Sequence, residues 1–171
     1  MFRKLSWLML GAITLVVAGY VTKSLATPAT PPPGFVSMTL AQGRFGQIDV
    51  FNRLINPDST VWLSLQKTQG DSDVYVQSNT WQPGADTGWH RHPGHSLITV
   101  IAGSVTVYEG NDPTCTPHVY TAGMGFVDHG GDHVHIVRNE GTVPASVIAV
   151  QVIPAGQPRR IDAPNPGNCL F

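Results

Sequence analysis

Apolar and polar residues alternate over short runs along most of the chain, which is the pattern of half-buried β-strands. Gly, Pro, Asn and Asp separate these runs and predict turns. The runs that we predict as strands are 48–51, 61–65, 73–81, 97–102, 105–108, 119–121, 126–127, 134–138 and 145–153. After residue 26, no stretch carries an apolar repeat of about 3.6 residues that is long enough for a substantial helix. The pattern predicts an all-β fold, a small double-sheet jelly-roll barrel.

Two of these runs, 97–102 and 105–108, are separated only by Gly103 and Ser104. A glycine at the first central position is what a type II′ turn requires. We therefore predict that the two runs pair with each other as a β-hairpin.

The first 26 residues have the pattern of a targeting segment. Arg3 and Lys4 precede an uncharged, mostly apolar run from Leu5 to Val21, and Ser24-Leu25-Ala26 offers small residues at the positions that a signal peptidase reads. We interpret residues 1–26 as a cleaved signal peptide; the alternative is an uncleaved membrane anchor, since the run is close to the shortest that spans a bilayer. The first interpretation predicts a periplasmic or secreted protein, and the second predicts a membrane-anchored domain that faces outward.

Composition divides the rest of the chain into three parts. Residues 27–38 are predicted to be an extended proline-rich spacer. Residues 39–155 are the predicted barrel, and residues 156–171 form a proline-rich tail. Cys115 and Cys169 are the only two cysteines, and an even pair in an oxidising compartment predicts a disulfide that would pin the tail to the barrel.

The charge of the chain excludes nucleic acid as a partner. Charged residues are 12% of the sequence and the net charge is −1, so no basic stripe is available to neutralise phosphates. The sequence has no Gly-x-Ser-x-Gly motif, no phosphate loop and no dinucleotide fingerprint. We expect contact with a membrane only through residues 1–26, if they are retained.

His90 and His92 are the first candidate for chemistry. They are separated by one residue, and residues i and i+2 of a strand project from the same face, so the pair can present two imidazoles to one point. Imidazole is a suitable ligand for zinc, copper, iron or nickel. An isolated His-x-His in a glycine-rich loop is more often a pair of polar loop residues than a metal site. The spacing of the residues around it therefore decides between the two interpretations.

That spacing resembles the first motif of the cupin superfamily. The motif reads Gly, five residues, His-x-His, three or four residues, Glu, six residues, Gly. Here Gly84, His90, His92 and Gly103 stand at the matching positions, and Ser96 stands where the family has its glutamate.

The second motif of the family is similar to residues 123–139, GMGFVDHGGDHVHIVRN. His135 and Asn139 have the family's spacing between histidine and asparagine. His129 stands where the motif has a proline, and one extra residue separates the Gly130-Gly131 turn from His135.

The resemblance implies a single cupin barrel, a double-stranded β-helix, with metal ligands at His90, His92 and His135. It implies a divalent metal ion, which could be Fe, Zn, Cu, Mn or Ni because imidazoles alone do not select among them. Ser96 is then close to the metal without being a strong ligand. Without the glutamate the metal keeps its full charge, which favours an anionic group of a small organic ligand or substrate.

Two further histidines are alternative or additional ligands. His95 precedes Ser96 and would reach the site if the Pro93-Gly94 turn shifted the register by one residue. His133 shares the strand face of His135, and the extra residue in that loop leaves the alignment open; the spacing to Asn139 favours His135.

Other residues near the motifs are given supporting roles. His129 is expected at the mouth of the barrel as a proton carrier or as a partner of a ligand, and Asn139 is expected close to the site. Asp128 and Asp132 flank the glycine turn, and we interpret them as turn residues because Asp side chains bond their own backbone in turns.

The sequence thus predicts an exported cupin-domain protein that binds a divalent metal through three histidines and acts on a small organic molecule. Dioxygenase, isomerase, decarboxylase and lyase chemistry all occur on this fold, so the fold does not select the reaction. The alternative is a non-catalytic protein that stores or senses a metal or small ligand. A monomer and a homodimer are both compatible with the sequence.

Overall fold

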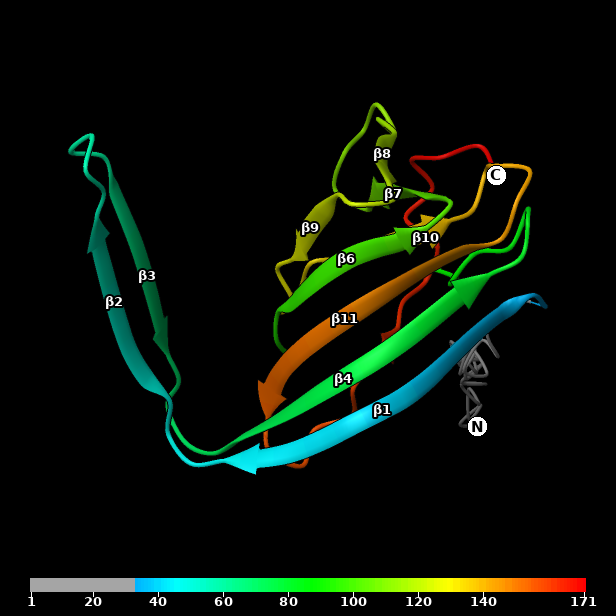
Figure 1. Ribbon diagram of the computed structural model, residues 1–171. Helices are drawn as coiled ribbons and strands as arrows, with labels where there is room; N and C mark the ends of the chain where they lie inside the picture. The colour runs from blue at the N-terminus through cyan, green and yellow to red at the C-terminus, as the bar shows by residue number, and fades with distance from the viewer. Residues whose placement is uncertain (1–32) are drawn as a thin grey trace, which may run out of the picture.

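The computed structural model describes residues 33–171. These residues form twelve β-strands and no α-helix, arranged as two five-stranded sheets and one separate hairpin (Figure 1). The prediction of an all-β fold built from two sheets is confirmed. The predicted signal peptide lies outside the described residues. Within the described part of the chain, no helix has the length and apolar character needed to cross a membrane.

The first sheet is antiparallel and has the order β1–β4–β11–β6–β9. Its strands are β1 (Phe35–Phe45), β4 (Ser72–Trp81), β11 (Ala145–Pro154), β6 (Ser96–Ala102) and β9 (Gly125–Asp128). β1 begins earlier than residue 39, where the sequence predicts the barrel to begin. The end of the predicted spacer is strand because Phe35 pairs with Trp81 at the end of β4, and their rings lie 5.0 Å apart.

The second sheet has the order β12–β5–β10–β7–β8. Its strands are β12 (Ile161–Asp162), β5 (His90–Arg91), β10 (His135–Arg138), β7 (Ser104–Glu109) and β8 (His118–Thr121). An apolar core fills part of the space between the two sheets; it consists of Trp81, Ala85, Val100, Val105, Val107, Val137, Ala145 and Val147. Alternation along each strand therefore directs one set of side chains to the interior, as the sequence pattern predicts.

The predicted hairpin at Gly103 is wrong. Gly103 has a positive φ of 66°, but β6 pairs with β11 and β9, whereas β7 pairs with β10 and β8. The chain crosses from one sheet to the other at this residue. A Cβ at Gly103 would lie 2.6 Å from the carbonyl oxygen of Pro144, so a glycine is needed for close approach as well as for its φ. A short glycine connection can join strands of different sheets as well as paired strands, and the local sequence does not distinguish the two.

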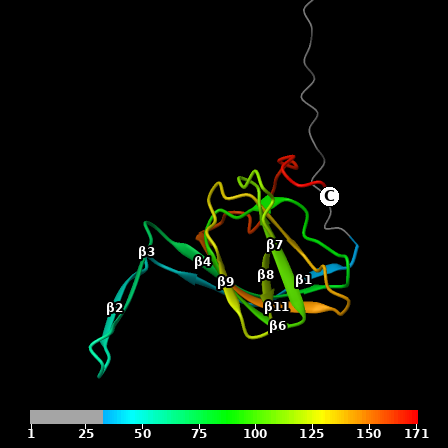
Figure 2. The same cartoon turned by 90° about the horizontal axis from the view of Figure 1, so that it is seen from above.

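β2 (Asp49–Ile55) and β3 (Val61–Lys67) form a hairpin that pairs only with itself and stands away from the two sheets (Figures 1 and 2). We call this hairpin the arm. The sequence places both runs in the barrel, and the structure corrects this. The arm grows from the end of β1 and the start of β4, which continue beyond the barrel.

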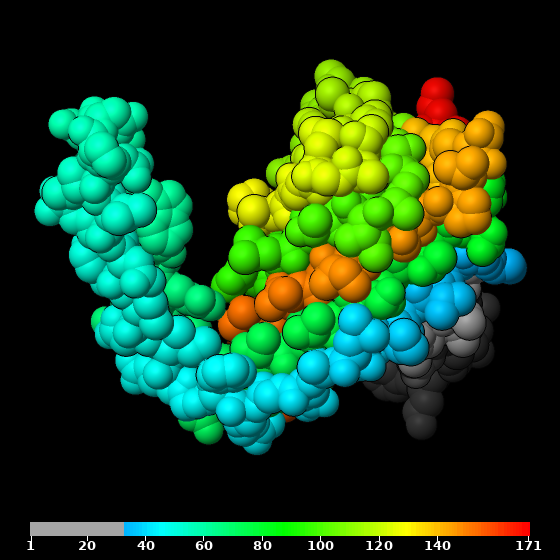
Figure 3. All heavy atoms as spheres, in the orientation of Figure 1, coloured from blue at the N-terminus to red at the C-terminus, as the bar shows by residue number. Residues whose placement is uncertain are grey.

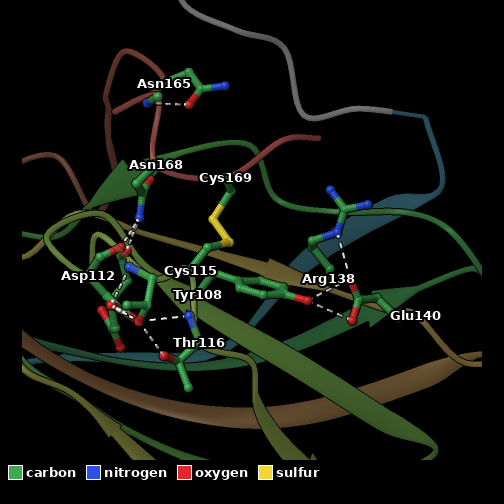
Figure 4. The surroundings of a disulfide bond; sticks show 12 residues. Tyr108, Asp112, Cys115, Thr116, Arg138, Glu140, Asn165, Asn168 and Cys169 are labelled. Carbon is green, nitrogen blue, oxygen red and sulfur yellow. Dashed lines mark hydrogen bonds and ion pairs between the residues drawn. A yellow bond between two sulfur atoms is a disulfide. The ribbon is translucent and has the colours of Figure 1, made fainter.

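The predicted disulfide is present between Cys115 and Cys169 (Figure 4). It joins the loop after β7 to the C-terminal tail, and the side chain of Asn168 donates hydrogen bonds to the carbonyls of Glu109 and Asp112, at 2.8 and 2.6 Å. The bridge spans a sequence separation of 54, which on the chain-entropy model contributes about 4 kcal/mol to the free energy of unfolding. The tail is thereby held against the second sheet, where β12 pairs with β5.

Candidate metal centre

Three histidines converge because two short strands pair in one register. His135 of β10 lies directly opposite His90 of β5, so their side chains project from the same face of the sheet. His92 follows two residues after His90 and returns to that face. The ligand atoms of His90, His92 and His135 lie within 4.8 Å of one another, and the ring centroids of His90 and His135 are 4.4 Å apart. The structure brings together the three residues that the motif spacing indicates.

Main-chain carbonyls lie behind all three imidazoles. Nδ1 of His90 is 2.9 Å from the carbonyl oxygen of Gly88, and Nδ1 of His92 is hydrogen-bonded to the carbonyl oxygen of Arg159. Nδ1 of His135 is 3.4 Å from the carbonyl oxygen of His133. A proton on Nδ1 satisfies these carbonyls and leaves Nε2 with a free lone pair, which is the arrangement that supports metal ligation.

Burial keeps the three imidazoles neutral. Desolvation is the main reason that the pKa of His90 lies well below 6.5, and the neighbouring histidines lower it further. Desolvation also lowers the pKa of His92, against the opposing charge of Asp128. For His135, desolvation outweighs the same aspartate and lowers the pKa to about 4. Neutral imidazole is the form that binds a metal, so this donor set fits a divalent cation.

The histidines line a cavity of about 180 Å³ between the two sheets. Its apolar walls come from Phe35, Trp81, Ile98, Phe126, Val137 and Val147. Drug-sized ligands occupy pockets of about 300–1,000 Å³, so this cavity suits a smaller molecule.

The structure does not bring His95 to this group. His95 lines a different groove together with Pro93 and Gly94. His133 lies near the site, but its Nε2 is 2.6 Å from Oε2 of Glu109. With Asp128 and His135 it forms a second group whose ligand atoms lie within 4.8 Å of one another.

Ser96, His129 and Asn139, which the sequence predicts close to the site, lie at different distances from the cavity. Ser96 is buried and lines the cavity, as expected. His129 is exposed, and its ring lies edge-on to the ring of His133, with the two centroids 5.5 Å apart. Asn139 is buried but does not line the cavity. Its side chain donates to the carbonyl of Trp81 at 3.2 Å and accepts from the amide of Gly141 at 3.0 Å, so it fixes the loops at the end of the barrel.

Sequence reasoning missed three charged residues that line the cavity: Asp128, Arg159 and Arg160. Asp128 does bond to its own turn, because its Oδ1 accepts from the amide of Gly130 at 3.0 Å, but the carboxylate is also buried among the histidines. A signal for Asp128 exists only in the strand register, since it lies opposite Ser96. Arg159 belongs to the tail, where no local pattern indicates a site.

A family model matches the part of the chain that carries the three histidines. Residues 79–151 match the family model described as a cupin domain. A cupin superfamily protein from Desulfitobacterium hafniense is similar, with 12% identity over 73% of this chain and 83% of that chain and a TM-score of 0.46. A cupin domain from Bordetella pertussis has 18% identity over 72% of this chain and 98% of that chain, with a TM-score of 0.45.

An oxalate oxidase bound to the substrate analogue glycolate is also similar, with 23% identity over 52% of this chain and 45% of that chain and a TM-score of 0.44. Comparison with curated proteins gave no match.

The metal-free protein is expected to lose stability as the pH falls from 6.5 to about 4. Burial lowers the folded-state pKa of His135 to about 4, whereas the unfolded residue titrates near 6.5, so protons bind the unfolded chain first over this range. His90 and His92 act in the same direction. Urea unfolding midpoints across the range, in the presence of EDTA, measure the effect. His135→Asn should have a smaller slope than the wild type, and two equal slopes would contradict the assignment.

Proposed function

Because the chain belongs to the cupin superfamily through the cupin domain at residues 79–151, we propose that it binds a divalent metal ion through His90, His92 and His135 and presents that ion to a small organic anion. The observation that carries the proposal is the convergence of three neutral imidazoles, two buried and one half-buried, on one small cavity. The ion is Fe, Zn, Cu, Mn or Ni, all of which imidazole can hold.

A metal at this place would act as a Lewis acid toward a ligand oxygen. The histidines would hold it by Nε2, since the carbonyls of Gly88 and Arg159 engage Nδ1 of His90 and His92 and fix the orientation of these two rings. Part of the cavity wall is apolar, which lowers the local dielectric and strengthens charge interactions inside.

Arg159 supports an anionic ligand. It lines the cavity, and its buried Nη1 has no hydrogen-bond partner among the described residues. A buried guanidinium N–H without an acceptor is costly, and a carboxylate would satisfy it with a charge-assisted hydrogen bond. Arg160 is different, because its Nη2 already donates to the carbonyl of Thr87 at 2.7 Å and its Nε to Asp162 at 2.6 Å.

The bound anion could be converted by dioxygenase, isomerase, decarboxylase or lyase chemistry. A non-catalytic binding or sensing protein would use the same histidines and the same arginine and would differ only in the absence of turnover. Oxygen uptake and product analysis on the metal-loaded protein separate these two functions.

We also infer that the protein works outside the cytoplasm. The disulfide between Cys115 and Cys169 is compatible with an oxidising compartment. Residues 1–26 have the pattern of a signal peptide.

His90→Ala, His92→Ala and His135→Ala are each expected to remove most of the bound metal, since two imidazoles hold a divalent ion poorly against competing ligands. Metal content per chain after dialysis, measured by mass spectrometry, tests this. His95→Ala is the matched control and should retain wild-type metal content. Loss of metal in His133→Ala with full retention in His135→Ala would overturn the assignment.

Arg159→Met is expected to weaken the binding of malonate to the metal-loaded protein by about tenfold or more, because a hydrogen bond to a charged group contributes about 1.5–3 kcal/mol. Titration calorimetry measures the dissociation constant, and malonamide serves as the uncharged probe of similar shape. Arg91→Met is the control, since Arg91 pairs with Asp132 and does not line the cavity. Equal affinity of the wild type for malonate and malonamide would contradict the role of an anion.

A further inference from the structure

The glutamate that the first motif lacks has a substitute on the neighbouring strand. Ser96 of β6 and Asp128 of β9 are partners in the antiparallel ladder, and both are 4% exposed. Partners in a ladder project from the same face, so both side chains enter the cavity. Ser96 Oγ is 3.5 Å from Oδ2 of Asp128. A carboxylate is therefore present beside the position where the motif has one.

The two oxygens of Asp128 face different groups. Oδ1 accepts from the amide of Gly130 at 3.0 Å, which holds it toward the glycine turn, and lies 3.7 Å from Nδ1 of His133 and 3.8 Å from Nδ1 of His135. Oδ2 is 3.7 Å from Nε2 of His92. This nitrogen is free because the hydrogen bond to the carbonyl of Arg159 uses Nδ1 of the same ring. Ligands of one ion at about 2.0–2.2 Å lie about 3–3.5 Å apart, so Oδ2 has to move toward His92 to share an ion with it, because Asp128 lies beside the three-histidine group and not within it.

The charge of Asp128 also calls for a cation. Among the described residues, its ion-pair contacts are only with histidines, and no lysine or arginine pairs with it. A buried carboxylate without a fixed positive charge is unfavourable unless it is paired or coordinates a metal.

We propose that Oδ2 of Asp128 is the carboxylate ligand of the metal, alongside His90, His92 and His135. This inference rests on the proposed function and moves the carboxylate of the site from β6 to β9. The bound ion then keeps one net positive charge toward the anion, not two.

Cobalt(II) binding, followed by calorimetry and by the visible d–d spectrum, tests this. Asp128→Asn keeps the size of the side chain and its acceptor for Gly130, and it should weaken cobalt binding by about tenfold or more and change the spectrum. The double variant Ser96→Glu/Asp128→Asn returns the carboxylate on the opposite ladder partner and should regain affinity. Asp132→Asn, an exposed carboxylate of the same turn, is the control and should bind as the wild type does.

Wild-type affinity and spectrum in Asp128→Asn, with loss in His92→Ala, would overturn the role of Asp128 and leave the three-histidine site standing. Loss in Asp128→Asn without recovery in the double variant would also overturn it, since the residue would then act through its turn. Equal cobalt binding by the wild type and His92→Ala would instead reject the proposed function itself.

A second inference comes from the arm, which is independent of the metal site. Seven of its large apolar side chains are more than half exposed: Phe51, Leu54, Ile55, Val61, Trp62, Leu63 and Leu65. Cross-strand pairing places five of them on one face. Phe51 lies opposite Leu65, Ile55 lies opposite Val61, and Leu63 lies between Val61 and Leu65 on the same face. A two-stranded hairpin alone is at best marginally stable in water. Figure 3 shows that an open hollow separates the arm from the barrel.

The outer face of the first sheet offers a matching surface. One residue from each strand lines up in the ladder to form a continuous apolar row: Ala41, Val76, Val150, Leu97 and Val127. Leu97 is 57% and Val127 48% exposed. We call these five residues the apolar row.

We infer that the arm of one protomer packs on the apolar row of a second copy of this chain. Both surfaces belong to the same chain, so a two-fold pair buries each of them twice. The arm exposes seven large apolar side chains that the described chain does not cover, and a contiguous exposed apolar surface commonly marks an interaction site.

Sedimentation analysis of the purified protein should find a dimer at micromolar concentration. Phe51→Asp on the arm and Leu97→Asp on the apolar row should each give monomers, and Val119→Asp, at an exposed valine of β8 outside both surfaces, should remain dimeric. Absence of free thiols and an unchanged far-ultraviolet circular dichroism spectrum verify folding. A monomeric wild type, including one that binds lipid vesicles instead, would overturn the inference, as would a dimer that survives both substitutions.

Discussion

The candidate site depends on one ladder position, at which His90 of β5 pairs with His135 of β10. β5 is only two residues long, yet it carries His90 and places His92 next to the cavity. A shift of one residue would turn His90 and His135 to opposite faces, because side chains alternate along a strand. β12 pairs with β5 on its other edge and so helps to hold this short strand in register.

Burial keeps these imidazoles neutral even though a carboxylate lies beside two of them. Burial disfavours the imidazolium form, whereas Asp128 acts in the opposite direction on His92 and His135, and burial prevails. Asp128 and Arg159 both line the cavity, so its charges suit a cation beside the aspartate and an anion beside the arginine. A metal with a bound organic anion, as proposed above, would satisfy both.

The sequence predicts most of the fold and the histidines, because both follow from local periodicity and spacing. Alternation identifies the strands, and His-x-His together with the His135-to-Asn139 spacing identifies the three imidazoles. Partners across the sheet are a different matter. Gly103 links two sheets instead of closing a hairpin, and Asp128 reaches the cavity because β9 pairs with β6. The residues next to Gly103 and Asp128 do not indicate which strands pair.

The arm illustrates the same restriction, since its alternation is that of a buried strand although the described chain covers neither of its faces. An alternating pattern indicates that one face of a strand is buried, but it does not indicate which surface covers that face.

The C-terminal tail has a consequence for the order in which the protein matures. Its residues supply the carbonyl that orients His92 and the guanidinium of Arg159, and the tail is tied down by the bridge from Cys169 to Cys115. While the two thiols are reduced, the tail lacks this covalent tie, and the ring of His92 and the anion-facing wall are less firmly held. If the pocket binds a ligand as proposed, oxidation of the thiols becomes a step in its assembly, and an environment that forms disulfides would be needed for full affinity.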